Sequence, residues 1–168
     1  MPLNSIQNLV VTQLDGLAMP DGIPNAIAYV APPVVEDMAE QPLIFVWGGR
    51  LSEKRQTMAG GRSATINTTS GFRTLDWEID VFIKYAMAND NTDIQNLFPL
   101  AIDLVMQKLR GITMPQKITD AVTGWPSQVV LIGEDMEMHY GDIHALSDQR
   151  YWLFEAEIIC KVREQIQQ

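Results

Sequence analysis

Hydrophobic and polar residues alternate strictly over residues 74–85, and this pattern predicts the clearest β-strand in the chain. Leu, Trp, Ile, Val and Tyr occupy one set of alternate positions, whereas acids and a lysine occupy most of the other set. A period of two is typical of a strand with one buried face. The same alternation over residues 150–162 predicts a long terminal strand, and residues 164–168 are expected to form a polar tail.

Two other stretches have apolar residues at helical spacing. The first covers residues 5–17, and Gly16, Pro20, Gly22 and Pro24 are expected to break it. The second follows a capping sequence at residues 90–92 and ends near Gly111, where basic side chains suit a helix C-terminus. Pro99 lies within this second helix and is expected to kink it or to mark a false start.

Shorter apolar runs bounded by proline and glycine complete the predicted elements. Strands are expected at residues 26–31, at 43–47 with Gly48 and Gly49 closing the strand, and at 128–132, with 136–140 pairing with that strand or continuing it. The order of elements lacks a regular alternation of strand and helix. It therefore predicts one α+β domain over residues 1–168, a mostly antiparallel β-sheet packed on one face by two helices.

Charge is distributed unevenly along the chain. The 168 residues contain 12 Lys and Arg against 21 Asp and Glu, a net charge of -9, which disfavours general binding to nucleic acid or to anionic membranes. Residues 50–73, here named the basic arm, hold five of these cations and only one acid, a local charge of +4 against -13 elsewhere. The arm is also rich in Gly, Ser and Thr, and we expect a protruding loop or long hairpin.

Other features of composition narrow the class of protein. The single cysteine, Cys160, cannot form an internal disulfide, and it falls in the core phase of the last strand, where it is expected to act as a small hydrophobe. The first residues lack the pattern of a secretion signal, and no run of apolar residues is long enough to span a membrane. A cytoplasmic protein without a cofactor is therefore expected.

Candidate catalytic chemistry is sparse. His139, Asp142 and His144 are ligand-type residues close in sequence, but their spacing matches no metal motif, and exposed turn residues are the simpler interpretation. Paired acids on the two alternating strands are the other candidate, since two carboxyl groups can hydrolyse a glycosidic bond when they face a cleft and one has a raised pKa. A small hydrolase with either site remains an alternative.

A solvent-exposed face of an antiparallel sheet is the simplest interpretation of these paired acids. A contact between subunits is a third interpretation, which we rank above catalysis. The basic arm and the acidic strand faces are complementary, and they would meet if the arm of one copy reached the sheet of another. The predicted contact residues are the cations of the arm and the acids that alternate along the two strands: Arg50, Lys54, Arg55, Arg62, Arg73, Asp76, Glu78, Asp80, Glu155 and Glu157.

The layout resembles that of the tail-terminator, or tail-completion, proteins of long-tailed bacteriophages. The resemblance rests on an N-terminal helix, a proline-flanked strand, a long loop before the alternating run at 77–83, a helix through 97–109, the segment 130–134 and the closing segment 150–158. It covers most of the chain and is carried by element order and hydrophobicity pattern.

The resemblance implies a non-enzymatic subunit of the virion tail or neck, assembled in the host cytoplasm. It implies a homo-oligomeric ring, typically a hexamer, which binds the last ring of the tail tube protein, stops tube growth and joins the tail to the head connector or stopper protein. The basic arm would contact a neighbouring subunit or face the lumen, through which DNA passes without specific binding. A head-tail stopper, adaptor or other neck protein is the alternative within the same class.

Overall fold

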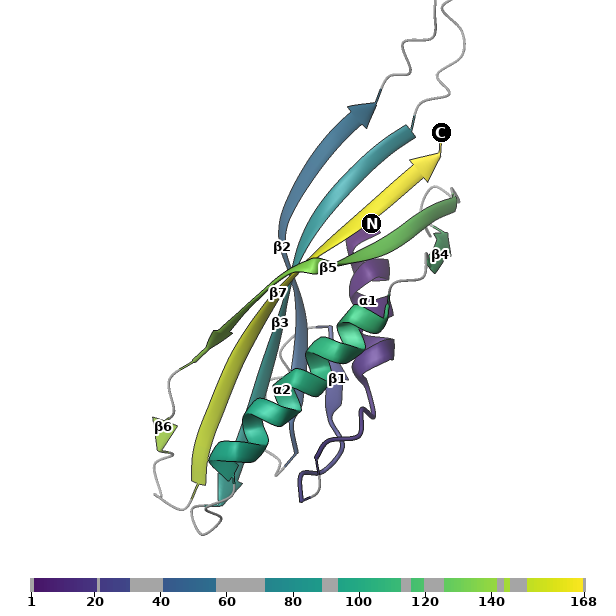
Figure 1. The fold of residues 1–168 in the computed structure, drawn as a ribbon. Helices are drawn as coiled ribbons and strands as arrows, with labels where there is room; N and C mark the ends of the chain where they lie inside the picture. The colour runs from purple at the N-terminus through teal and green to yellow at the C-terminus, as the bar shows by residue number, and fades with distance from the viewer. Residues whose placement is uncertain are drawn as a thin grey trace, which may run out of the picture.

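The computed structural model shows two helices and a seven-stranded sheet, the α+β class that the sequence predicts (Figure 1). It describes residues 2–20, 22–30, 41–56, 72–88, 94–112, 116–119, 126–141, 144–145 and 151–167. In chain order the elements are α1 (Pro2–Leu14), β1 (Ile27–Tyr29), β2 (Leu43–Gln56), β3 (Phe72–Ala88), α2 (Ile94–Gly111), β4 (Gln116–Thr119), β5 (Pro126–Tyr140), β6 (His144–Ala145) and β7 (Tyr151–Gln167).

The sheet has the strand order β1-β2-β3-β7-β5-β4, and the short β6 also pairs with β7. All of these neighbours are antiparallel except β1 and β2, which are parallel. The two strands with the strictest alternation, β3 and β7, pair along their whole length, from Phe72 opposite Gln167 to Ala88 opposite Tyr151. The most regular stretches of sequence therefore form the centre of the sheet.

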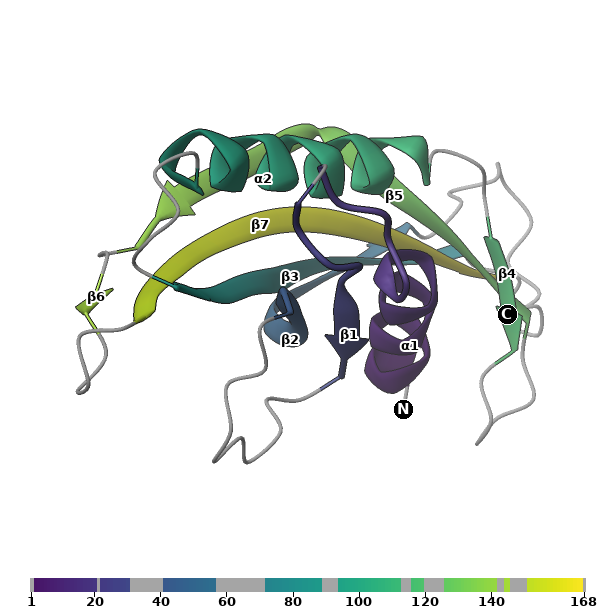
Figure 2. The same cartoon turned by 90° about the horizontal axis from the view of Figure 1, so that it is seen from below.

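The strands are much longer than the helices that cover them. β3 and β7 have 17 residues each, which corresponds to roughly 55 Å of extended chain, whereas the 18 residues of α2 span roughly 27 Å. Figure 2 shows the curved β7 running beneath α2. No helix among the described residues is long and apolar enough to cross a membrane.

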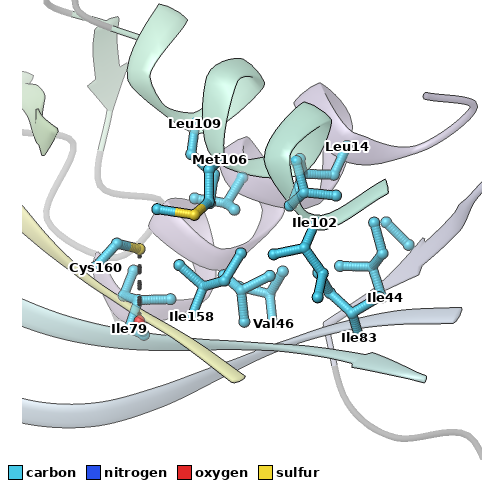
Figure 3. Close-up of a cluster of buried hydrophobic side chains, with 14 of the residues drawn as sticks. Leu14, Ile44, Val46, Ile79, Ile83, Ile102, Met106, Leu109, Ile158 and Cys160 are labelled. Carbon is cyan, nitrogen blue, oxygen red and sulfur yellow. Dashed lines mark hydrogen bonds between the residues drawn. The ribbon is translucent and has the colours of Figure 1, made fainter. Parts of the chain in front are cut away.

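One hydrophobic core joins both helices to the same face of the sheet (Figure 3). Ile102 and Leu109 of α2 and Leu14 of α1 lie above Ile83 and Ile158 of the central strands, and all five side chains are fully buried. Burial of such side chains is the main stabilising contribution to a fold of this size. The alternating positions of β3 and β7 thus face the helices as predicted.

Two predicted strand ends are wrong. Gly48 and Gly49 do not close β2, which continues to Gln56 past a bulge between Gly48 and Leu51. A Cβ at Gly49 would lie only 3.0 Å from Oδ2 of Asp80, so glycine here permits a close approach of two strands rather than a turn. The expected polar tail is also strand, because β7 pairs with β3 as far as Gln167.

The remaining elements differ from the predictions in their bounds. α1 starts at Pro2 rather than residue 5 and ends at Leu14 rather than residue 17, because Gly16 has a φ of 71° that excludes helix. α2 runs from Ile94 through Pro99 without interruption, which excludes a false start at that proline. Residues 128–132 and 136–140 form the single strand β5, so the second segment continues the first instead of pairing with it.

Candidate functional site

The acids of the central strands gather on the face of the sheet opposite the helices, here named the open face. Asp76, Glu78 and Asp80 of β3 and Glu155 and Glu157 of β7 all lie on this face, where the acids of β7 are opposite Lys84 and Phe82. All five side chains are half-buried. The structure therefore places these acids on one face of the sheet, but it spreads them along the strands, and Asp80 and Glu157 are the two that lie diagonally next to each other across β3 and β7.

Two of these acids are held by cations on the neighbouring strand. Arg163 donates two hydrogen bonds to Asp76, from Nε to Oδ1 at 2.7 Å and from Nη2 to Oδ2 at 3.3 Å. Lys84 forms an ion pair with Glu155, with Nζ 2.5 Å from Oε1. Both pairs join residues directly opposite each other in the β3–β7 register, the arrangement in which opposite charges stabilise a sheet.

The acids between these two ion pairs are Glu78, Asp80 and Glu157, here named the acidic cluster. Burial raises the pKa of Asp80, and the negative charges of Glu157 and Glu78 raise it further. Arg50, the first cation of the basic arm, opposes this increase in the pKa. Arg50 and Asp80 thus attract each other within one chain, at the bulge of β2, whereas the predicted contact joins the arm of one copy to the acids of another.

Apolar side chains lie on the open face among the charges. Trp47 is directly opposite Asp80 and is 50% exposed. Phe82 and Ile159 are half-buried on the central strands, and Tyr29 stacks on Phe45 at a ring-centroid distance of 6.2 Å. A surface that mixes apolar groups with ion pairs is typical of a contact between proteins.

Most of the basic arm belongs to the sheet or lies outside the described residues. Lys54 and Arg55 are in β2, and Arg73 is in β3 directly opposite Arg55. Residues 57–71, which include Arg62, are outside the described part of the chain. The flanks of the arm are therefore paired strands rather than loop, because β2 and β3 remain hydrogen-bonded up to Gln56 and Phe72.

A shallow groove of about 300 Å³ crosses the open face near one end of the sheet. Lys84 of β3, Glu155 and Glu157 of β7, and His139 of β5 line it, together with the backbone near Gly141. His139 lies directly opposite Glu157 in the register and 3.9 Å from Glu137. The lining also includes the aromatic residues Phe82 and Tyr140, so the groove suits a segment of a partner that has both apolar and charged side chains.

A metal site at the two histidines finds no support in the described residues. His139 lies opposite Glu157 and His144 lies opposite Leu153, so four residues of β7, roughly 13 Å, separate their backbones. No group of three or more metal-ligating side chains occurs in the part of the chain that the structure describes. Asp142, the third predicted ligand, lies outside that part.

Cys160 is fully buried, as its position in the alternation predicts. Its thiol lies 3.4 Å from the carbonyl oxygen of Ile79, to which it donates (Figure 3). Burial raises the pKa of Cys160 to about 12, and the charge of Asp80 acts in the same direction. A thiol in this environment is not a nucleophile at neutral pH.

Sequence reasoning did not single out Lys84 and Arg163, the cations that hold Asp76 and Glu155. Both residues occupy polar positions in the alternation of their strands, and this alternation is the feature of the sequence that could have identified them. Their partners depend on the β3–β7 register, which joins residues far apart in the chain, such as Asp76 and Arg163.

A comparison with known protein families finds no match for this chain, and neither does a comparison with curated proteins.

Proposed function

We propose that this chain is a structural assembly subunit, the tail terminator of a long-tailed bacteriophage. The observation that carries the proposal is the open face, an extended sheet surface on the side opposite the helices, on which charged and apolar side chains are mixed. The order of the helices and strands also supports the proposal, although β2 occupies the first part of the segment that the resemblance treats as a long loop.

The chemistry of the open face favours binding over catalysis. A hydrolase with two carboxyl groups needs one protonated acid and one ionised acid that face a shared cleft. Asp76 and Glu155 are instead held by cations, and the groove near Glu155 is not lined by Asp80. Paired charges of this kind fix the position of a partner and discriminate against partners of the wrong charge.

One observation favours the rival hydrolase, which we place second. The pKa of Asp80 is raised, and Glu157 lies near enough to contribute to the increase. A raised carboxyl pKa beside a second carboxyl group is the arrangement of a general acid with its partner. A glycosidase assay in which Asp80→Asn abolished activity would support this function over the structural one.

In the proposed assembly, copies of the chain form a ring on the last ring of the tail tube. The ring stops tube growth and presents its other side to the head connector or stopper protein. The net charge of -9 suits a channel for DNA, because an acidic wall does not hold phosphate groups by tight contacts. A stopper or adaptor subunit of the neck has the same requirements and is the alternative within this class.

Two experiments test the proposal: a measurement of the mass of the purified chain in solution, and an assay of its binding to the ends of tail tubes. The purified chain should sediment as an oligomer, and negative-stain electron microscopy should show rings. Mixed with phage tail tubes, these rings should bind at one tube end and halt further polymerisation of tube protein. Rings that bind the head connector and ignore tube ends would identify a stopper instead. A chain that neither binds tubes nor binds the connector would contradict a role in the neck.

A further inference from the structure

Among the residues that the structure describes, both outer edges of the sheet are incompletely paired. β1 pairs with β2 only at residues 43–45, and β4 pairs with β5 only at residues 126–129. No other described strand pairs with the outer edge of β2 over residues 47–56 or of β5 over residues 130–140. Such edges expose backbone N–H and C=O groups that can pair with a strand of another chain.

The unpaired stretches of the two edges lie at the same position along the direction of the strands. Leu51 of β2 is connected through Trp77 and Val162 to Leu131 of β5, each residue pairing with the next. A second series of paired residues places Val46 of β2 at the same position along the strands as Met138 of β5. A second copy placed beside the first without a shift along the strands would therefore bring β5 of one copy against β2 of the other over these stretches.

The strand directions suit this arrangement. β2 and β3, β3 and β7, and β7 and β5 are all antiparallel, so β2 and β5 run in opposite directions within one chain. A neighbouring copy with its helices on the same side would place its β2 antiparallel to β5 of the first copy. The pairing would continue the ladder pattern that prevails through the sheet.

The two edges carry opposite charges in the stretches that lie at the same position along the strands. Arg50 is the charged residue of β2 in this stretch, and it lies in the bulge opposite Glu78. β5 has Glu134, Asp135 and Glu137 in its own irregular stretch between Ile132 and Glu137. The exposed Trp47 and Leu51, which are 50% and 51% accessible, lie beside Arg50 on the β2 edge. The β2 edge is thus cationic and apolar, and the β5 edge is anionic.

This charge pattern decides which edges meet. Two β5 edges would place acids against acids, and two β2 edges would place arginine against arginine, so a twofold dimer through like edges is disfavoured. An opposite-edge contact is attractive and leaves one free edge of each kind on every dimer. Repetition of such a contact gives a closed ring or a filament.

We propose that the β2 edge of one copy pairs with the β5 edge of the next, which extends the sheet from subunit to subunit. Arg50 then lies across the new ladder from the region of Ile132, directly next to the acidic stretch 134–137 of its neighbour. The occupant of each edge is a second copy of this chain. The inference deepens the proposed function by naming the surface of self-association, and it rests on that function only in expecting an oligomer.

Charge reversal on one edge at a time tests the pairing in the full-length chain. Arg50→Glu makes both edges acidic in the shared stretch, and the double variant Glu134→Lys/Glu137→Lys makes both edges basic there. Each variant alone should need at least tenfold more protein to reach the oligomer mass in sedimentation. A one-to-one mixture of the two should recover assembly, because acidic edges then alternate with basic edges around the oligomer.

Control variants at exposed positions of α2 change the net charge by the same amount as the test variants but leave both edges unchanged. Arg110→Glu matches the first variant, and Asn96→Lys/Asp103→Lys/Gln107→Lys matches the second. These controls should assemble like the wild-type chain. Recovery in the mixture also excludes misfolding, since an unfolded variant is not rescued by a partner. Slowed amide hydrogen exchange over residues 47–52 and 131–138 at assembling concentration would give independent support.

The outcomes separate this inference from the proposed function. Rings that cap tail tubes but do not respond to either charge reversal would overturn the edge pairing and leave the terminator role in place. Assembly that follows the edge charges without any capping of tubes would support the pairing and reject that role. A wild-type chain that stays monomeric, or charge-reversed variants that fail to recover when mixed, would overturn the pairing.

Discussion

Arg163 and Asp76 form a two-pronged ion pair across the central strands, with hydrogen bonds of 2.7 and 3.3 Å. The two side chains are 43% and 20% exposed, so solvent screens the attraction in part. The pair ties the end of β7 to the part of β3 that leads to the basic arm. It therefore joins the two central strands on the open face, while their neighbours Leu75, Trp77 and Val162 belong to the core on the other face.

We expect this pair to contribute measurably to stability. A double-mutant cycle with Asp76→Ala and Arg163→Met should give a coupling of about 0.5–1 kcal/mol in the free energy of unfolding, the upper part of the range for partly exposed pairs. The coupling should shrink in 1 M salt, because added ions screen exposed charges. Urea denaturation of the four variants measures it. A coupling energy near zero at low salt would show that the ion pair does not contribute to the free energy of unfolding.

The acidic cluster makes stability depend on pH in a predictable direction. The pKa of Asp80 is raised in the folded chain, so the folded state binds this proton more readily than the unfolded state does. Stability from this carboxyl group is present below its unfolded pKa of 3.8 and is lost as pH rises through the folded value.

Asp80→Asn should therefore stabilise the chain at pH 7 by about 0.5 kcal/mol, with the value kept small because the carboxyl group is partly exposed. The gain should disappear near pH 3. Thermal unfolding of both variants across this pH range measures the difference. The exposed Asp103→Asn on α2 serves as the control, and it should show no such trend. Destabilisation of Asp80→Asn at pH 7 would contradict the raised pKa.

The bulge of β2 requires glycine at one position. A Cβ at Gly49 would lie 3.0 Å from Oδ2 of Asp80 and 3.2 Å from the backbone oxygen of Glu78, and the backbone atom cannot rotate away. Gly49→Ala should destabilise the chain by about 1 kcal/mol through this crowding. Gly111→Ala, at the open end of α2, meets no atom within 4 Å and should stabilise by about 0.5 kcal/mol. Chemical denaturation of both variants compares the two sites.

Adjacent isoleucines of β7 should differ sharply in their contribution to stability. Ile158 is fully buried beneath the helices, whereas Ile159 is half-buried on the open face. Ile158→Ala should cost about 2–5 kcal/mol, because it removes buried methyl groups and leaves a cavity in the core. Ile159→Ala should cost less than half as much. Equal losses in denaturant unfolding would mean that the open face is covered as closely as the core.

Cys160 should resist modification in the folded chain. Its thiol is buried and its pKa is raised to about 12, so very little thiolate exists at pH 8. Iodoacetamide should label the native chain at least a hundredfold more slowly than the chain unfolded in urea. Mass spectrometry of timed samples measures both rates. Rapid labelling without denaturant would show that β7 opens locally.

Local patterns predict the class of this fold well. The period-two alternation at residues 74–85 and 150–162 identifies the central strands and both of their faces, because a buried strand face needs apolar residues at every second position. The helical spacing before Gly16 and Gly111 identifies the two helices for the corresponding reason. These signals lie within neighbouring residues, so they need no knowledge of the rest of the chain.

Strand ends and bulges are less predictable. Gly48 and Gly49 match the usual sequence of a turn, yet β2 passes through them because β3 continues to offer backbone partners as far as Phe72. Residues 164–167 are polar enough for an unpaired tail, yet they pair with the same part of β3. In both places hydrogen bonds to a distant strand outweigh the local preference of the residues.

The candidate site shows the same division. Sequence alone identified the five acids and the cations of the arm, because charge is a property of each residue. Their partners came from the fold: Asp76 is held by Arg163, Glu155 is held by Lys84, and Arg50 lies close enough to Asp80 to lower its pKa. Alternation along a strand states which face a side chain takes, but the register between strands far apart in the chain decides what it meets there. That register follows from packing of the whole sheet against both helices, and no local pattern contains it.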